Sequence, residues 1–255
     1  MKKTFLFLIA LSFFSTLFCQ NIDLNKIEIP TILDERSNRI ITHKGFTVSY
    51  NYDWKIPNWV AYELTDWEVE GEVTRYDKFK PDPMVPQNVT ATTNDYKHSG
   101  YDRGHMAPAA DMKWDEQAMK ESFYLSNICP QNPNLNGGVW KYLEEQVRVL
   151  ASQKGKIFVI CGPIVNDAST TIGENKVVVP QAFFKVLLQE EDNEINTIGF
   201  VYENKSGKRP MSTYAMTVDE VEETTKIDFF PSLPNKIEKK VESEVDFSKW
   251  TVHTK

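Results

Sequence analysis

Five stretches of the chain predict β-strands, because each is rich in β-branched or aromatic residues and is bounded by Gly, Pro, Asn or Asp. They are residues 46–52, 59–64, 156–161, 177–188 and 195–202. No repeat, low-complexity tract or Gly/Ser linker interrupts residues 40–230. The pattern therefore predicts one domain with several strands in its core.

Helical periodicity is clearest after Asn136, where an apolar stripe recurs at the spacing of one helix face and Gly155 marks the end. The stripe consists of Trp140, Leu143, Val147 and Leu150. Two shorter helices are predicted over residues 114–123 and 218–225. Segment 76–99 is rich in Pro and Asn and has no periodicity, so it predicts a long surface loop.

The N-terminus predicts export. Lys2 and Lys3 precede an apolar run of about fifteen residues, and polar sequence follows at once. We expect a signal peptide over residues 1–19 and a periplasmic or extracellular protein without stable membrane association. The run is short for a membrane anchor. Lipidation of Cys19 is the alternative to cleavage, but that signal prefers a small residue where Phe18 stands.

The remaining chain divides into an N-terminal extension over residues 20–44, one domain over 45–231, and a charged, peripheral tail over 232–255. Composition supports a globular domain, with 41% hydrophobic and 25% charged residues. The 29 basic and 36 acidic residues give a net charge of −7, and loss of Lys2 and Lys3 makes it −9. This net negative charge excludes the class of proteins that bind polyanions through a large overall positive charge.

Three cysteines are too few for a disulfide scaffold or a cysteine-based zinc module. Removal of the leader leaves Cys129 and Cys161. The sequence leaves open whether these two form a disulfide or stay as buried thiols.

The first group of residues with chemical potential is the block Asp102-Arg103-Gly104-His105. Histidine can take a proton from water near neutral pH, whereas a guanidinium holds phosphate oxygens without losing its charge. The block is therefore suited to attack on a phosphate. The alternative is a turn in which Asp102 and Arg103 form a surface salt bridge.

The second group lies on the predicted long helix. Glu144 and Arg148 fall on one flank, at the border of the apolar stripe, where they would line the edge of a cleft. An ordinary Glu–Arg pair at i, i+4 is the alternative. Asn136 stands where a helix N-cap is expected, but its amide oxygen also suits Mg²⁺, which takes few protein ligands and keeps several waters.

Together these residues resemble the DNA/RNA non-specific endonuclease family, the Asp-Arg-Gly-His nucleases with a ββα-metal active site. The resemblance covers residues 45–231 and depends on a set of blocks in the same order, since one short motif arises by chance. The blocks are residues 57–62, 74–75, 102–105, 108–111, 127–131, 136–140, 143–144, 162–163 and 228–231.

The resemblance implies an α+β fold, in which helices flank a central, mostly antiparallel sheet and a ββα-metal finger forms the active site. It also implies that His105 is the general base and that Asn136 is the direct ligand of Mg²⁺, with Mn²⁺ as the alternative ion. Glu144 then corresponds to the acidic residue that holds a metal-bound water.

By the same resemblance, Arg75, Arg103 and Arg148 act in catalysis by contacting phosphate, and Asn127 belongs to the substrate-binding block beside the histidine. DNA and RNA are the implied substrates, with 5′-phosphorylated products, and the oligomeric state stays open. An acidic body repels such polyanions, so we expect a local basic funnel. Its members would be Arg75, Lys78, Lys80, Lys97 and Arg103.

Two other functions compete with this interpretation. A catalytically silent, secreted nucleic-acid-binding protein of the same fold is disfavoured because His105, Asn136 and Glu144 are all present. A serine esterase or a zinc peptidase is disfavoured because the chain lacks G-x-S-x-G and H-E-x-x-H and has only four histidines.

Overall fold

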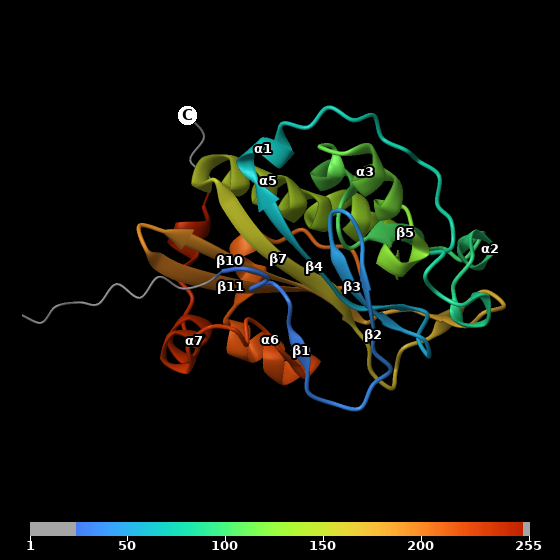
Figure 1. The fold of residues 1–255 in the computed structure, drawn as a ribbon. Helices are drawn as coiled ribbons and strands as arrows, with labels where there is room; N and C mark the ends of the chain where they lie inside the picture. The colour runs from blue at the N-terminus through green and yellow to red at the C-terminus, as the bar shows by residue number, and fades with distance from the viewer. Residues whose placement is uncertain (1–23, 252–255) are drawn as a thin grey trace, which may run out of the picture.

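A seven-stranded antiparallel sheet forms the centre of the molecule (Figure 1). The computed structural model describes residues 24–251, so the predicted signal peptide and Cys19 lie outside the described residues. The strand order is β12-β11-β10-β7-β4-β3-β2. The strands are β2 (Arg39–Thr42), β3 (Thr47–Asn51), β4 (Ile56–Thr65), β7 (Lys156–Ile164), β10 (Ala182–Glu191), β11 (Glu194–Glu203) and β12 (Ala215–Met216).

Side chains alternate strictly between the two faces of this sheet. On β4, Val60 and Tyr62 enter the larger core, whereas Trp59 and Ala61 enter the smaller core on the other face. The same alternation continues along β7 and β10. Both faces of the central strands are therefore buried, which explains why these strands read as nearly continuous apolar runs.

Helices cover both faces (Figure 1). The larger core includes Leu143, Val147 and Leu150 of α5 (Lys141–Lys154), the stripe predicted from the sequence. The smaller core includes Val218 and Val221 of α6 (Val218–Thr225), beside which lies α7 (Asn235–Glu242). The remaining α-helices are short: α1 (Asp66–Val69), α2 (Thr93–Tyr96), α3 (Glu116–Ser122) and α4 (Pro133–Leu135).

Smaller elements surround the sheet. Three pairs of short strands are β5 (Asp102–His105) with β6 (Ile128–Gln131), β8 (Thr171–Ile172) with β9 (Val177–Val178), and β1 (Thr31–Ile32) with β13 (Ile227–Asp228). Short helical turns are η1 (Gln87–Val89), η2 (Ala109–Met112), η3 (Leu125–Asn127), η4 (Asn136–Trp140), η5 (Met211–Tyr214) and η6 (Phe247–Trp250). The β5–β6 pair followed by α5 is the predicted ββα arrangement, so the expected α+β fold is confirmed.

Three expectations about the chain need correction. The predicted strand 177–188 is two strands, β9 and β10, because Pro180 cannot donate a ladder hydrogen bond. The tail after residue 231 is not peripheral, since it contains α7 and inserts Trp250, 1% exposed, into the larger core. At the other end, β2 is part of the main sheet, so the folded unit begins before residue 45.

Cys129 and Cys161 are free, buried thiols, so they do not form the disulfide that the sequence left open. Burial raises the pKa of both thiols, which keeps them protonated and unreactive. Among residues 24–251, no helix is both long enough and apolar enough to cross a bilayer.

Candidate active site

The strand that carries the predicted base is held unusually close to its neighbour. In the antiparallel β5–β6 pair, Gly104 lies opposite Cys129 and His105 opposite Ile128. A Cβ atom on Gly104 would lie 2.2 Å from Oε1 and 2.6 Å from Cβ of Gln131. Glycine at position 104 is therefore required for this close packing, which fixes the backbone next to His105.

Asn127 fastens the backbone that follows His105. Its Oδ1 accepts a hydrogen bond from the Ala107 backbone N–H at 2.8 Å, and its Nδ2 donates to the carbonyl oxygens of Ala107 and Ser122 at 2.9 Å. The side chain is fully buried. The polar atoms of Asn127 are already bound within the protein. Its side chain therefore positions the backbone after His105, whereas the sequence analysis expected it to contact substrate.

Two aromatic rings enclose His105. The ring centroids of Phe79 and Phe123 lie 5.3 and 4.9 Å from that of the imidazole. The Nε2 atom of His105 is buried and has no hydrogen-bond partner. Burial, with a smaller contribution from the positive charge of Arg75, lowers the pKa of His105 to about 3. The imidazole is therefore neutral, the form that can accept a proton.

The same two rings carry the predicted arginines. The guanidinium of Arg75 lies 5.0 Å from the centroid of Phe123, and that of Arg103 lies 4.6 Å from the centroid of Phe79. Arg75 is half-exposed and also pairs with Asp77 at 2.5 Å. His105, Arg75 and Arg103 thus meet around an aromatic pair that no sequence motif indicated.

Asn136 is not the N-cap of the predicted long helix. It follows the short α4, whose cap is Asn132, since the Asn132 side chain accepts a hydrogen bond from the backbone N–H of Asn134. Non-helical backbone at Gly138 then separates Asn136 from α5. Asn136 Nδ2 donates to Asp102 Oδ2 at 2.9 Å, which leaves its amide oxygen free to bind another group. Asp102 is thus a positioning residue rather than the salt-bridge partner of Arg103.

Arg148 is held by a buried carboxylate. Its Nη1 donates to Asp111 Oδ1 at 2.7 Å, and Asp111 Oδ2 accepts a hydrogen bond from the Tyr62 hydroxyl at 2.8 Å. The i, i+4 spacing had allowed an ion pair between Arg148 and Glu144. Among the residues that the structure describes, Arg148 pairs with Asp111 and not with Glu144. The arginine side chain is 18% exposed, so part of its guanidinium can still reach a ligand.

Glu144 is half-buried beside α5's apolar stripe. Burial and the neighbouring charge of Asp111 raise its pKa to about 8, against the opposing effect of Lys185 and Arg148. Lys185, which sequence analysis missed, is 1% exposed, and its Nζ lies 4.9 Å from the ring centroid of Trp140. The only sequence signal for it is a lysine within the apolar run of β10.

The available donors fit a hard divalent cation. Asn136 offers a neutral amide oxygen whose nitrogen is already fixed by Asp102, and Glu144 offers a carboxylate. Such oxygen donors suit Mg²⁺, which binds few protein ligands and retains water.

A basic depression of about 380 Å³ lies beside the turn that carries Asn136. Leu135, Val139, Lys208 and Arg209 are among the residues that line it. Neither cation takes part in an ion pair within residues 24–251. Sequence analysis did not include this loop in the basic funnel.

The family is established by comparison with known proteins. The model of the DNA/RNA non-specific endonuclease family matches residues 24–236, so the chain belongs to that family. Its fold resembles a crystal structure of the EndoG/EndoGI complex, with a TM-score of 0.74 at 30% identity over 78% of this chain and 88% of that chain.

Individual relatives are also nucleases by name. Mitochondrial nuclease EXOG from Danio rerio is 38% identical over 207 residues, or 75% of this chain. Mitochondrial endonuclease G from Homo sapiens is 32% identical over 75% of this chain and 69% of its own length, and a nuclease from Nostoc is 30% identical over 82% and 79%. The chain spans 60% of the Danio rerio relative and 56% of EXOG from Mus musculus.

The lowered pKa of His105 predicts acid sensitivity. The unfolded chain binds a proton at this histidine below its usual pKa of 6.5, and the folded chain does so only near pH 3, so stability is complete above pH 6.5 and falls as the pH drops. We expect His105 to account for about 1 kcal/mol of the stability lost between pH 7.5 and 5.5. Urea unfolding followed by tryptophan fluorescence measures this loss.

The His105→Ala variant should lose about 1 kcal/mol less over that interval than the native chain. His98→Asn is the matched control, because His98 is exposed and asparagine tolerates its left-handed backbone at φ 59°. Equal pH slopes for the native chain and His105→Ala would contradict the assignment.

Proposed function

We propose that the chain is a metal-dependent endonuclease that hydrolyses phosphodiester bonds of DNA and RNA and leaves 5′-phosphorylated products. One observation carries this proposal. The neutral, half-buried imidazole of His105 lies within an aromatic pair that also holds Arg75 and Arg103. A base beside two fixed cations is the arrangement that attack on a phosphate requires.

His105 acts as the general base in this proposal. A water oxygen attacks phosphorus while the imidazole takes one of its protons, and the bond from phosphorus to the 3′ oxygen breaks. The 3′ oxygen leaves with a proton from solvent, so the products are a 5′-phosphate and a 3′-hydroxyl. The histidine is ready for this step because its low pKa keeps it unprotonated at neutral pH.

The arginines stabilise the charge that develops on the phosphate. Arg75 and Arg103 are restrained by stacking on Phe123 and Phe79, and Arg148 is restrained by Asp111. Side chains fixed before substrate arrives lose little entropy when they bind it, so their interaction energy is available to the transition state.

Asn136 and Glu144 would hold the metal, Asn136 directly and Glu144 through a bound water. Mg²⁺, or Mn²⁺ in its place, supplies positive charge to the phosphate oxygens and the leaving oxygen when bound. Asp102 orients Asn136, and Lys185 and Arg148 favour the charged form of Glu144. These residues therefore prepare an oxygen-lined position for the cation.

Tolerance for both DNA and RNA follows from the kinds of contact proposed. Arginines and a cation recognise phosphate, which is common to both polymers, and need not read a base or a 2′-hydroxyl. Lys208 and Arg209 in the adjacent basic depression could extend this phosphate contact along the strand.

Plasmid nicking tests the activity. We expect the native chain to cleave supercoiled DNA and RNA with Mg²⁺ and to stop when EDTA is added. Loss of the base in His105→Ala should lower the rate by about 10³-fold, within the usual range for general-base catalysis. His98→Asn, an exposed histidine change, should retain native activity.

Full activity in His105→Ala would exclude this mechanism. A folded native chain that binds nucleic acid but cleaves neither polymer with Mg²⁺, Mn²⁺ or Ca²⁺ would instead favour the silent binding module.

The metal ligand can be tested separately. In Asn136→Ala the half-saturating Mg²⁺ concentration for cleavage should rise by about tenfold, because a direct ligand is lost. Asn134→Ala is the control, since Asn134 is exposed and lies in the same helical turn. An unchanged Mg²⁺ titration in Asn136→Ala would remove this residue from the metal site.

We also propose that the protein is exported. The first twenty residues combine two lysines with an apolar run and contain no arginine, whereas mitochondrial transit peptides are rich in arginine. Mass spectrometry of the protein made in its host should find a mature chain that begins near Gln20. An uncleaved chain retained in the cytoplasm would contradict export.

A further inference from the structure

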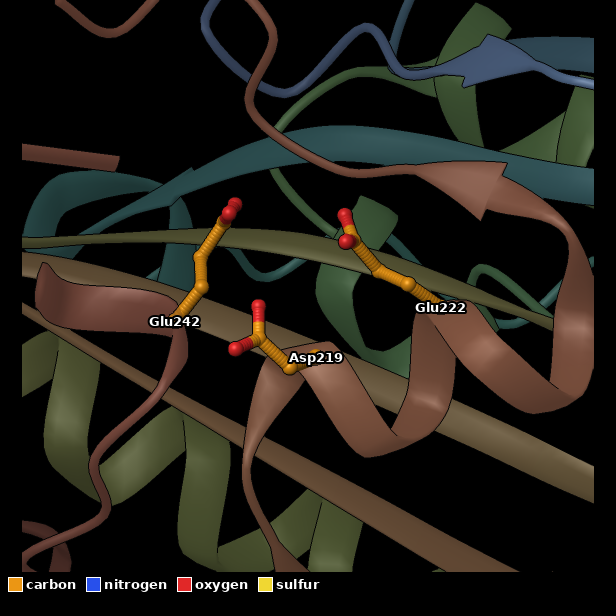
Figure 2. Close-up of side chains that lie close together, drawn as sticks. All are labelled: Asp219, Glu222 and Glu242. Carbon is orange, nitrogen blue, oxygen red and sulfur yellow. The ribbon is translucent and has the colours of Figure 1, made fainter. Parts of the chain in front are cut away.

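Three carboxylates converge between α6 and α7, on the side of the sheet opposite α5 (Figures 1 and 2). Asp219 and Glu222 lie three residues apart on α6, and therefore on one face of that helix. Glu242 is the last residue of α7. One oxygen from each of the three carboxylates lies within 4.8 Å of the other two.

Glu242 makes this group more than a cluster of surface acids. Its side chain is 4% exposed, and its Oε1 is buried without a hydrogen-bond partner. Glu222 uses one oxygen to accept a hydrogen bond from the Phe229 backbone N–H at 2.7 Å, which leaves its second oxygen free. A buried, unpartnered carboxylate oxygen is costly, so the site lacks a bonding partner for Glu242.

No protein cation balances these charges. Within residues 24–251, none of the ion pairs includes Asp219, Glu222 or Glu242. Asp228 and Glu238 add further negative charge nearby, and burial together with this repulsion raises the pKa of Glu242 to about 9 and that of Glu222 to about 7.

We propose that Asp219, Glu222 and Glu242 bind one Ca²⁺ ion, which joins α7 to α6. Calcium binds carboxylate oxygens at about 2.3–2.6 Å, so oxygens on opposite sides of one ion lie up to about 5 Å apart. The three ligand oxygens lie within 4.8 Å of one another and are compatible with that spacing.

The chemistry of the group favours Ca²⁺ over the other common ions. All three ligands are oxygens, which disfavours zinc, since its sites are rich in sulfur and nitrogen. Magnesium needs oxygens at about 2.1 Å in a strict octahedron and usually keeps several waters, so a site with three protein carboxylates suits it less well. Asp219 is exposed, so that side can admit the waters that complete a calcium shell of six to eight oxygens.

Isothermal titration calorimetry with Ca²⁺ tests the site, after chelator treatment of the full chain. The native chain should bind Ca²⁺ with an affinity between micromolar and millimolar. Asp219→Asn and Glu222→Gln should each weaken binding at this site by at least about tenfold, since each removes one of the three carboxyl ligands. Glu223→Gln, an exposed change on the same helix, should bind as the native chain does.

Thermal unfolding gives a second measurement. It shows whether Glu242 binds Ca²⁺ or only contributes to packing. Ca²⁺ should raise the native midpoint by about 3 °C or more over the value in chelator. Glu242→Gln should lose this gain, yet unfold in chelator at or above the native midpoint, because glutamine has nearly the shape of the uncharged glutamic acid that a pKa of about 9 implies at neutral pH. Exposed Glu244→Gln is the control and should retain the gain.

The proposal is overturned if the native chain shows no calcium heat assignable to these residues, or if the calcium-induced gain persists in Asp219→Asn, Glu222→Gln and Glu242→Gln alike. A lower midpoint for Glu242→Gln in both chelator and Ca²⁺, with the gain intact, would give Glu242 a packing role only. Plasmid nicking is read separately, so loss of nuclease activity and loss of this site are distinguishable.

Discussion

Enclosure of His105 by Phe79 and Phe123 sets the electrostatics of the whole site. An imidazole surrounded by aromatic carbon loses the hydration that would stabilise its proton, so it stays neutral beside two arginines without an acid to compensate it. Most catalytic histidines are instead oriented by a carboxylate, which would raise the pKa. Here the nearest carboxylate on the same strand, Asp102, is committed to Asn136. One strand thus carries His105 and, through Asp102, positions Asn136, while the two side chains have separate surroundings.

Around α5, the site contains charged side chains that lie in an otherwise apolar core. Lys185 alternates with core residues on β10 and meets Trp140, while Asp111 binds both Arg148 and Tyr62 beneath α5. Buried charges of this kind contribute little net stability, because desolvation offsets their attraction. Their effect is geometric. Asp111, Arg148 and Tyr62 are hydrogen-bonded to one another, which holds them in one arrangement before any ligand binds.

The sequence predicted best where local signals and tertiary packing agree. The helix over Val218–Thr225 was found with its observed bounds, because a capping threonine precedes an amphipathic stretch. The Asp-Arg-Gly-His block was found by its motif. Phe79, Phe123 and Lys185 were not found, because their roles depend on which distant segments fold against them. The helix predicted from Asn136 onward starts later, at Lys141, because the backbone is non-helical at Gly138.

Trp250 illustrates how far such packing extends along the chain. Its indole lies in the same core as Val60 on β4 and Leu143 on α5, although it is more than a hundred residues from either. During synthesis the larger core therefore has a hole the size of a tryptophan until residue 250 has been made. The order of synthesis therefore delays the final packing of this core until residue 250 is available, long after β4 and α5 have been made.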